Sequence, residues 1–319
     1  MKRILVLTGM LLTFVTCSGW AQKTIQLSIA TGGTGGVYYP IGRVMANIIS
    51  GNIPYAEAIS EVTTASVDNC FLIGAGKTEL ALIMADTGWD AFQGRATFKE
   101  RIPLRALAAL YPNYLHIVTL EERGIEKVTD LKGKRVSTGA ERSGTEVMAM
   151  RLLESYGLDA DKHMVRKKLG ASESSEALKE DRIDAYFWVG GLPTPSVASL
   201  GSAQRIKIKF IGHDDAVERM REKYGPLYTK GTIPAGTYPR QDGNIQVAVV
   251  CNLLVCHQNM KKEIAYDVVK VLFDHKQELM AVHRDPKFLS LECQTSRFSS
   301  VPFHPGAIRY FEEKGRVLD

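Results

Sequence analysis

The order of apolar and polar residues near the start of the chain predicts a strand followed by a helix. Residues 24–31 alternate between apolar and polar side chains, which is typical of a half-buried strand. Four glycines at positions 32–36 interrupt this pattern. Apolar residues then recur at helical spacing over positions 37–48, so a helix is predicted to begin near Tyr38 or Tyr39.

Further along the chain, strand patterns alternate with helical patterns. Strands are predicted at residues 80–84, 104–110, 116–119, 135–138, 185–189, 206–211 and 247–256. Helices are predicted at residues 146–156, 174–180, 215–224 and 262–279. This alternation predicts an α/β protein. Because the 319 residues exceed a typical single domain of about 100–200 residues, two lobes are expected.

The first 21 residues have the pattern of a cleavable export signal. Two basic residues precede a mostly apolar stretch at 4–15, and small residues lead to a cleavage site after Ala21. Export through this signal would place the protein in the periplasm. A lipoprotein anchored at Cys17 is the less favoured alternative, because residues 14–16 make a poor lipobox. No later apolar run approaches the ~18 residues that a membrane span needs.

Charge and motifs exclude several classes of function. The net charge is +5, and removal of Lys2 and Arg3 with the signal would leave +3, too little to favour a nucleic-acid partner. The chain contains no G-x-S-x-G or H-E-x-x-H motif, and its histidines and cysteines lack zinc-ligand spacing. The sequence therefore favours a binding protein over an enzyme, with no metal or cofactor.

The glycine-rich run at residues 30–43, ATGGTGGVYYPIGR, is the first candidate for a ligand site. Glycines let backbone N–H groups face a ligand, and the start of a helix leaves several N–H groups unpaired, so this loop is suited to an anion. Nucleotide motifs fail on spacing: Tyr38 replaces a glycine of the dinucleotide fingerprint, and Phe71 replaces the first glycine of a Walker A loop. A tight turn with a packed aromatic pair is the alternative.

A second loop with a helix start lies in residues 130–150, DLKGKRVSTGAERSGTEVMAM. Ser143 and Glu146 form the S-x-x-E pattern of a capping box. The N–H groups that follow Ser143 would lie at the positive end of a helix, with Arg142 beside them. Two such helix starts would suit an acid with two negative ends, whereas the simpler alternative is that the motif only starts a helix.

Five segments carry a family resemblance. They are ATGGTGGVYYPIG from residue 30, LYPNYLHIV at 110–118, DLKGKRVSTGAERSGTE from 130, IPAGTYP at 233–239 and VPFHPGAIRYFEEKG at 301–315. In this order they resemble the TAXI family, the extracytoplasmic solute-binding proteins of tripartite ATP-independent periplasmic (TRAP) transporters. The resemblance implies a type II periplasmic-binding-protein fold, in which a hinge joins two α/β lobes around a ligand cleft. The expected division is a signal peptide at 1–21, lobe 1 at 22–115, lobe 2 at 116–245 and a return to lobe 1 at 246–319.

The resemblance also implies a set of ligand-binding positions. They are Thr34, Gly35, Gly36 and Tyr38 in the first loop, Ser143, Gly144 and Thr145 in the second, Gly190, Gly191 and Pro193 in a turn after a strand, and Tyr111 near the cleft. Arg142 departs from the family pattern, in which proline or glycine is common, and is a candidate for a carboxylate contact or a solvent-facing residue.

Three further residues have two interpretations each. Arg43 also departs from the family pattern, and its position on a helix favours a solvent-facing side chain. Asp86 lies between a strand and a helix pattern, which favours an N-cap over contact with a ligand. Trp188 either closes over a ligand or packs in the core.

The function implied by the resemblance is capture of a small organic anion. The expected ligands are a dicarboxylate, a 2-oxo acid such as 2-oxoglutarate, or an acidic amino acid such as glutamate. The protein would act as a monomer, close its lobes around the ligand and deliver it to TRAP permease subunits for uptake driven by an ion gradient. A periplasmic ligand-sensing receptor for a signalling membrane protein is the alternative.

Overall fold

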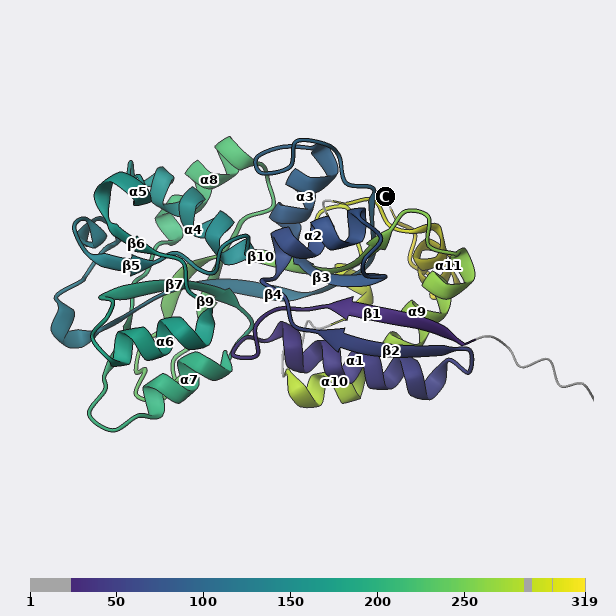
Figure 1. Cartoon of the computed structure of the whole chain (residues 1–319), viewed down its shortest axis with the longest axis horizontal. Helices are drawn as coiled ribbons and strands as arrows, with labels where there is room; N and C mark the ends of the chain where they lie inside the picture. Colours follow the sequence, from purple (N-terminus) through teal and green to yellow (C-terminus); the bar gives the residue numbers. More distant parts are fainter. Residues whose placement is uncertain (1–23, 284–288, 300, 319) are drawn as a thin grey trace, which may run out of the picture.

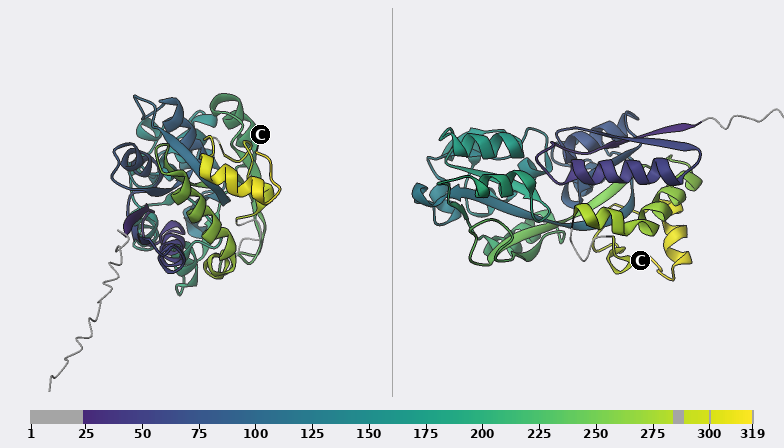
Figure 2. Two further views of the ribbon diagram at one scale, coloured as in Figure 1. Left: turned by 90° about the vertical axis from the view of Figure 1, so that its right-hand side faces the viewer. Right: turned by 90° about the horizontal axis from the view of Figure 1, so that it is seen from below.

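The computed structural model describes residues 24–283, 289–299 and 301–318, and the predicted signal peptide at 1–21 lies outside them. Figure 1 shows an α/β protein with two lobes that share one band of strands. Figure 2 shows the same lobes arranged along the longest axis of the molecule. The expected fold class, an α/β protein of two lobes with a cleft between them, is confirmed, and the connection between the lobes consists of shared strands. None of the helices in the described part has the length and apolar content that crossing a membrane requires.

Lobe 1 contains both the first and the last elements of the described chain. Its elements are β1 (Ile25–Ala30), α1 (Tyr38–Asn52), β2 (Ala56–Glu61), α2 (Ser66–Gly74), β3 (Leu80–Met84), α3 (Ala85–Gln93), α9 (Lys262–Asp274), α10 (Lys276–Val282), the 3₁₀ turn η4 (Leu291–Cys293) and α11 (Pro305–Glu313). The strand β1 pairs in parallel with both β2 and β3. The start of α1 at Tyr38 agrees with the prediction from the sequence.

Lobe 2 is built from the middle of the chain. Its elements are η1 (Glu121–Arg123), η2 (Val128–Leu131), β5 (Arg135–Ser137), α4 (Gly144–Ser155), α5 (Ala160–His163), β6 (Val165–Lys167), α6 (Ala171–Lys179), β7 (Ala185–Gly190), α7 (Pro195–Ser202), β8 (Ile208–Phe210), η3 (Asp214–Ala216), α8 (Val217–Tyr224) and β9 (Thr229–Ile233). The strand β5 pairs in parallel with β6 and β7.

Two long antiparallel strands, β4 (Leu104–Leu120) and β10 (Ile245–His257), belong to both lobes. The strand order is β2-β1-β3-β10-β4-β7-β5-β6, with β8 on β4 and β9 on β10. The second half of β4 pairs with β7 of lobe 2, and the second half of β10 pairs with β3 of lobe 1. The proposed boundaries at 115/116 and 245/246 fall within β4 and at the first residue of β10.

Some element boundaries differ from the sequence prediction. The two predicted strands at 104–110 and 116–119 are parts of the single 17-residue strand β4, which continues through Pro112 and Asn113. Pro112 and Asn113 interrupt the run of apolar residues in the sequence, but both residues pair with β10. The helix predicted at 262–279 is divided at His275 into α9 and α10. The strand β2 was missed because it is an edge strand with few buried residues.

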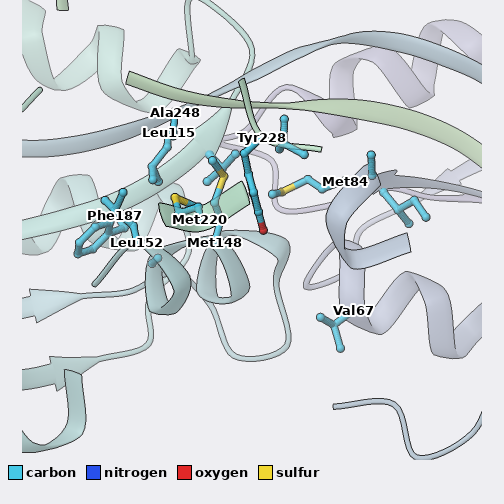
Figure 3. Close-up of a cluster of buried hydrophobic side chains, with 14 of the residues drawn as sticks. Val67, Met84, Leu115, Met148, Leu152, Phe187, Met220, Tyr228 and Ala248 are labelled. Carbon is cyan, nitrogen blue, oxygen red and sulfur yellow. The ribbon is translucent and has the colours of Figure 1, made fainter. Parts of the chain in front are cut away.

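The largest apolar core crosses from one lobe to the other. It contains Val67 and Met84 from lobe 1 together with Met148 and Phe187 from lobe 2, and Tyr228 lies between them (Figure 3). Two further clusters are confined to one lobe each, one beneath α1, α9 and α11 and one beneath α6 and α7. The lobes are therefore packed against each other in this structure, beside the cleft.

A buried histidine supports the wall of lobe 2 next to the cleft. The Nδ1 atom of His116 lies 2.9 Å from the carbonyl oxygen of Tyr114, so this nitrogen carries the proton and donates. Its Nε2 atom, 2.8 Å away, accepts from the hydroxyl of Tyr238. The same hydroxyl oxygen accepts from the backbone N–H of Thr194 at 3.0 Å. This chain of hydrogen bonds holds the turn after β7 against β4.

The buried histidines predict a dependence of stability on pH. Burial lowers the pKa of both His116 and His213 to about 4. The unfolded chain takes up these protons near pH 6.5 and the folded protein only near 4, so the free energy of unfolding should fall as the pH drops through this window. The loss should reach about 3 kcal/mol for each histidine, measured by urea denaturation at pH 7 and pH 4.

The His116→Gln variant should show a shallower pH dependence than the native protein, and His275→Gln, a change at a partly exposed position, should not. A denaturation midpoint that stays constant from pH 7 to pH 4 would contradict the assignment of neutral buried imidazoles.

Candidate functional site

A cavity of about 270 Å³ lies between the lobes. Its described lining residues are 32–38, 62–66, Met84, Asn113, Ala140, 143–145, 170–173 and 188–190. Four helices begin at this cavity: α1 and α2 from lobe 1, and α4 and α6 from lobe 2. Because the start of a helix carries unpaired N–H groups and a partial positive charge, these helix starts contribute positive potential to the cavity without a basic side chain.

The structure brings most of the predicted ligand-binding residues to this one cavity. Those that line it are Thr34, Gly35, Gly36, Tyr38, Ser143, Gly144, Thr145 and Gly190. The two glycine-rich loops, more than a hundred residues apart in the sequence, thus face each other across the cleft. Trp188 also lines the cavity, and its Nε1 donates to Oγ1 of Thr194 at 2.9 Å, so its ring is held in place from behind.

The predicted residues Tyr111, Gly191 and Pro193 do not line the cavity. Tyr111 faces a separate cavity between β4, β9 and β10, and its ring centre lies 4.4 Å from that of His283. A Cβ atom at Gly191 would lie 2.4 Å from Cε1 of His283, so Gly191 belongs to the same junction. Pro193 follows a cis peptide bond and leads into α7. These residues shape the turn beside the site instead.

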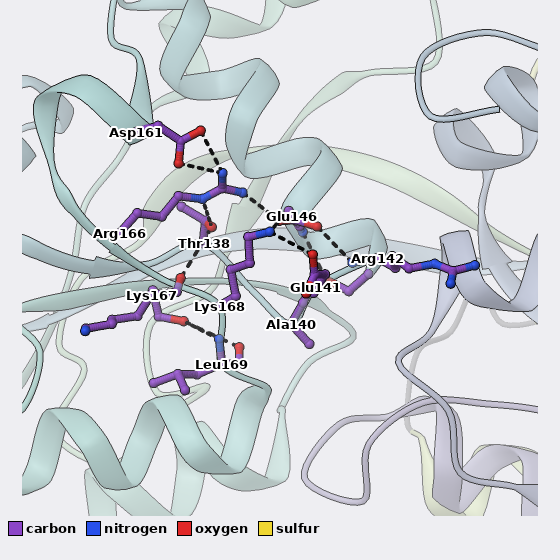
Figure 4. A network of polar contacts seen from close by, with 12 residues as sticks. Thr138, Ala140, Glu141, Arg142, Glu146, Asp161, Arg166, Lys167, Lys168 and Leu169 are labelled. Carbon is purple, nitrogen blue, oxygen red and sulfur yellow. Dashed lines mark hydrogen bonds and ion pairs between the residues drawn. The ribbon is translucent and has the colours of Figure 1, made fainter. Parts of the chain in front are cut away.

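Arg142 also lies outside the cavity lining, and its side chain is engaged elsewhere. Its Nη2 is 3.4 Å from Oδ1 of Asp68, and its guanidinium lies 4.8 Å from the ring centre of Phe71. Figure 4 shows this side chain pointing away from the network of Glu146, Arg166 and Lys168. Because Asp68 and Phe71 belong to α2, Arg142 bridges the two lobes rather than reaching into the cavity.

The start of α4 is capped by a side chain, whereas the start of α1 has no side-chain cap. The Ser143 hydroxyl accepts from the N–H of Glu146 at 3.1 Å, as the capping box predicts. The Glu146 carboxylate accepts from the N–H of Arg142 at 2.8 Å and not from that of Ser143, so the box is shifted by one residue. Arg43, on α1, is exposed, as its helical position predicts.

The floor of the cavity is polar and was not predicted from the sequence. The Tyr38 hydroxyl and Nδ2 of Asn113 both donate to Oδ1 of Asn252. Burial raises the pKa of Tyr38, so its hydroxyl keeps its proton. Asn113 is 1% exposed, and its Oδ1 has no hydrogen-bond partner among the described residues. An asparagine inside each of two apolar strands, β4 and β10, was the signal in the sequence that could have identified them.

The glycines of the loops are required by the approach of the opposite lobe. A Cβ atom at Gly35 would lie 2.1 Å from Oγ of Ser172, and one at Gly144 would lie 2.5 Å from Sδ of Met84. The backbone N–H of Ser196 donates to the carbonyl oxygen of Gly35 at 3.2 Å. These contacts join loops from different lobes, so the structure represents a closed arrangement of the cleft.

A buried ionic cluster also joins the lobes. Arg151 of α4 pairs with Asp90 of α3, and its Nη1 lies 3.5 Å from Oδ2 of Asp86. The Tyr228 hydroxyl accepts from Arg151 at 2.8 Å and donates to Asp86 at 2.7 Å. Burial raises the pKa of Asp90, and the charge of Arg151 opposes that shift. The expected role of Asp86 as an N-cap is wrong, because Met84 holds that position and the Asp86 carboxylate faces this cluster.

The charges around the cavity restrict what it can bind. None of the described residues that line it is lysine, arginine or histidine, and Glu173 is the acidic residue among them. Within the described part of the chain, His, Cys, Asp and Glu side chains form no group of three or more that could hold a metal ion. An anion in this cavity would be held by N–H groups, hydroxyls and the helix starts.

The chain matches one known protein family over most of its length. Residues 29–315 match the NMT1-like family. The chain belongs to this family. Among solved structures, a protein from Bordetella bronchiseptica RB50 is similar to this NMT1-like protein in fold, with a TM-score of 0.52, 16% identity, and coverage of 81% of this chain and 75% of that chain.

Two further structures align with this NMT1-like protein at lower scores. A putative L-cystine ABC transporter protein from Listeria monocytogenes has a TM-score of 0.49 and 16% identity, covering 83% of this chain and 95% of that chain. The periplasmic aliphatic sulphonate binding protein from Escherichia coli has a TM-score of 0.45 and 14% identity, covering 90% of this chain and 82% of that chain.

The buried cluster of this NMT1-like protein predicts a large effect of one substitution. Arg151→Met removes the cation and leaves Asp86 and Asp90 buried between the lobes, which should lower the free energy of unfolding by about 3–5 kcal/mol. Arg219→Met is the matched control, because Arg219 also pairs with an aspartate and lies over a tyrosine ring, but is exposed. Its cost should be within about 1 kcal/mol. If both variants lost the same free energy of unfolding in urea denaturation, the buried cluster would contribute no more to stability than an exposed ion pair.

Proposed function

We propose that this protein captures a small organic acid or amino acid outside the cytoplasm and delivers it to a TRAP-type membrane permease. The observation that carries the proposal is the cavity between two lobes, at which α1, α2, α4 and α6 all begin. A carboxylate there would accept hydrogen bonds from N–H groups and hydroxyls, and it would need no lysine or arginine side chain to balance its charge. The resemblance of the loop motifs to the TAXI family supports the permease type, and the predicted signal at 1–21 supports a periplasmic location.

The closed arrangement supports a binding cycle rather than a reaction. Loops from both lobes contact each other beside the cavity, so separation of the lobes would widen the path by which a ligand enters or leaves. The shared strands β4 and β10 connect the lobes, and their ladder has register shifts between Cys251 and Leu253 and between Leu254 and Val255. Such irregular positions are suited to absorb a hinge rotation. The permease would then recognise the closed form and accept the ligand when the lobes open.

Dicarboxylates, 2-oxo acids such as 2-oxoglutarate, and acidic amino acids such as glutamate form the first ligand panel, with neutral amino acids and sugars beside them. The exported chain, residues 22–319, should be stabilised by its ligand by about 2.7 kcal/mol at a hundred times the dissociation constant. Thermal unfolding measures this directly. Stabilisation by sugars alone would contradict the proposal, because the site is assigned to an anionic group.

The glycine loop provides a variant that tests the cavity as the binding site. Gly35→Val should weaken ligand binding by at least about tenfold in calorimetry, because its side chain would collide with Ser172 and hold the lobes apart. Gly51→Val is the control, since its Cβ position has no atom within 4 Å. Normal affinity in a folded Gly35→Val protein would exclude this loop from the ligand site.

A further inference from the structure

We propose that the ligand is an amino acid with one carboxylate and an uncharged side chain, whose amino group donates to Oδ1 of Asn113 at the floor of the cavity. This inference rests on the proposed function and narrows the ligand class. Three observations support it: an unpaired buried acceptor, a lining without basic side chains, and an acidic residue at the cavity.

The unpaired acceptor is the carbonyl oxygen of Asn113. The other end of this amide, Nδ2, is occupied by its hydrogen bond to Asn252, so Oδ1 is the end left for a ligand. A buried acceptor without a donor is destabilising, and a ligand N–H would satisfy it. A 2-oxo acid offers only acceptor oxygens at the corresponding carbon. An amino group offers donors, so it fits this position and the oxo group does not.

In this structure the Asn113 amide is oriented by its hydrogen bond to Asn252. Tyr38 and Asn113 both direct donors at Oδ1 of Asn252. Rotating the Asn113 amide alone would bring two carbonyl oxygens together. Rotating both amides would restore the pair and turn Nδ2 of Asn113 to the cavity, since Nδ2 of Asn252 also has no partner among the described residues, and the comparison of amino acids with 2-oxo acids distinguishes the two arrangements. Asn252 itself is absent from the cavity lining. In the arrangement that this structure shows, Asn113 presents an acceptor to the cavity.

The charge of the lining favours a single carboxylate. A carboxylate at the helix starts is balanced by their partial positive charges, about half a unit each. A second carboxylate would find no lysine, arginine or histidine among the described lining residues, and it would share the cavity with Glu173. Two like charges that share one cavity repel each other. The same Glu173 favours a ligand that carries an ammonium group.

The remaining wall accommodates an uncharged side chain. Val37, Met84, Trp188 and Val189 contribute apolar surface to the cavity. Hydrophobic walls with a few placed polar groups are typical of small-molecule sites. The cavity thus combines helix starts that suit a carboxylate, the acceptor Oδ1 of Asn113 and an apolar wall.

Calorimetry with matched ligands tests the inference on the native protein. The first set is leucine, 2-hydroxy-4-methylpentanoate and 2-oxo-4-methylpentanoate, which share a carbon skeleton and differ only at the second carbon. The second set is glutamine, glutamate and 2-oxoglutarate. Within at least one set, the uncharged-side-chain amino acid should bind at least tenfold more tightly than either partner. A tighter 2-oxo acid or a tighter dicarboxylate would overturn the inference.

Two variants then test which residues cause the preference for an amino acid with an uncharged side chain. Asn113→Ala should reduce the preference for the amino acid over its 2-oxo partner at least tenfold, and Asn259→Ala, on an exposed turn, should leave it unchanged. Glu173→Gln should raise the affinity for glutamate relative to glutamine. Its control is Glu176→Gln on the same helix, which lies outside this cavity and pairs with Lys179. Because Glu173 is exposed, its variant remains informative if Asn113→Ala does not fold.

The outcomes separate this inference from the proposed function. Binding of a carboxylate without the predicted ranking, or a ranking that Asn113→Ala and Glu173→Gln leave intact, would overturn the inference and leave the proposed function standing. A folded protein that binds none of the six carboxylates would count against both.

Discussion

The pairing of β4 with β10 is the constraint on which the rest of the structure depends. Each strand is hydrogen-bonded into the sheet of both lobes, so neither lobe can move without changing the ladder between them. Asn113 and Asn252 lie in the middle of these two strands and meet at the floor of the cavity. The floor is therefore built from the connection between the lobes, and the walls are carried by the lobes themselves. Separation of the walls would therefore also change the geometry of the floor, because the register shift between Cys251 and Leu253 flanks Asn252.

The convergence of four helix starts explains why the loops at the cavity are rich in glycine and short side chains. Positive helix ends repel one another weakly, and bringing them together leaves several backbone N–H groups without partners. Any side chain at Gly35 or Gly144 would keep these ends further apart, because the opposite lobe is already in contact. An anionic group is the chemistry that satisfies such an arrangement. The requirement for glycine is thus set by the geometry of closure as much as by contact with a ligand.

The sequence predicted the elements better than the contacts between them. The helix start at Tyr38, the strand β3 and the cap at Ser143 depend on local patterns, and all three were predicted. The position of Arg142 and the role of Asp86 depend on which helix lies opposite, and a single sequence does not contain that information. The polar floor was not predicted for a related reason. An asparagine inside an apolar strand looks like the end of that strand, unless its partner on the neighbouring strand is known.

The contact between the lobes combines opposing free-energy contributions. The apolar cluster that includes Met84, Met148 and Tyr228 favours closure, because separation would expose it to water. The charges of Arg151, Asp86 and Asp90 act in the other direction, since burying them costs solvation that their mutual attraction only partly returns. An interface made only of the apolar cluster would favour closure more strongly. The ionic cluster inside the interface reduces the free energy gained on closure, so a ligand needs a smaller difference in affinity between the open and closed forms to shift the balance.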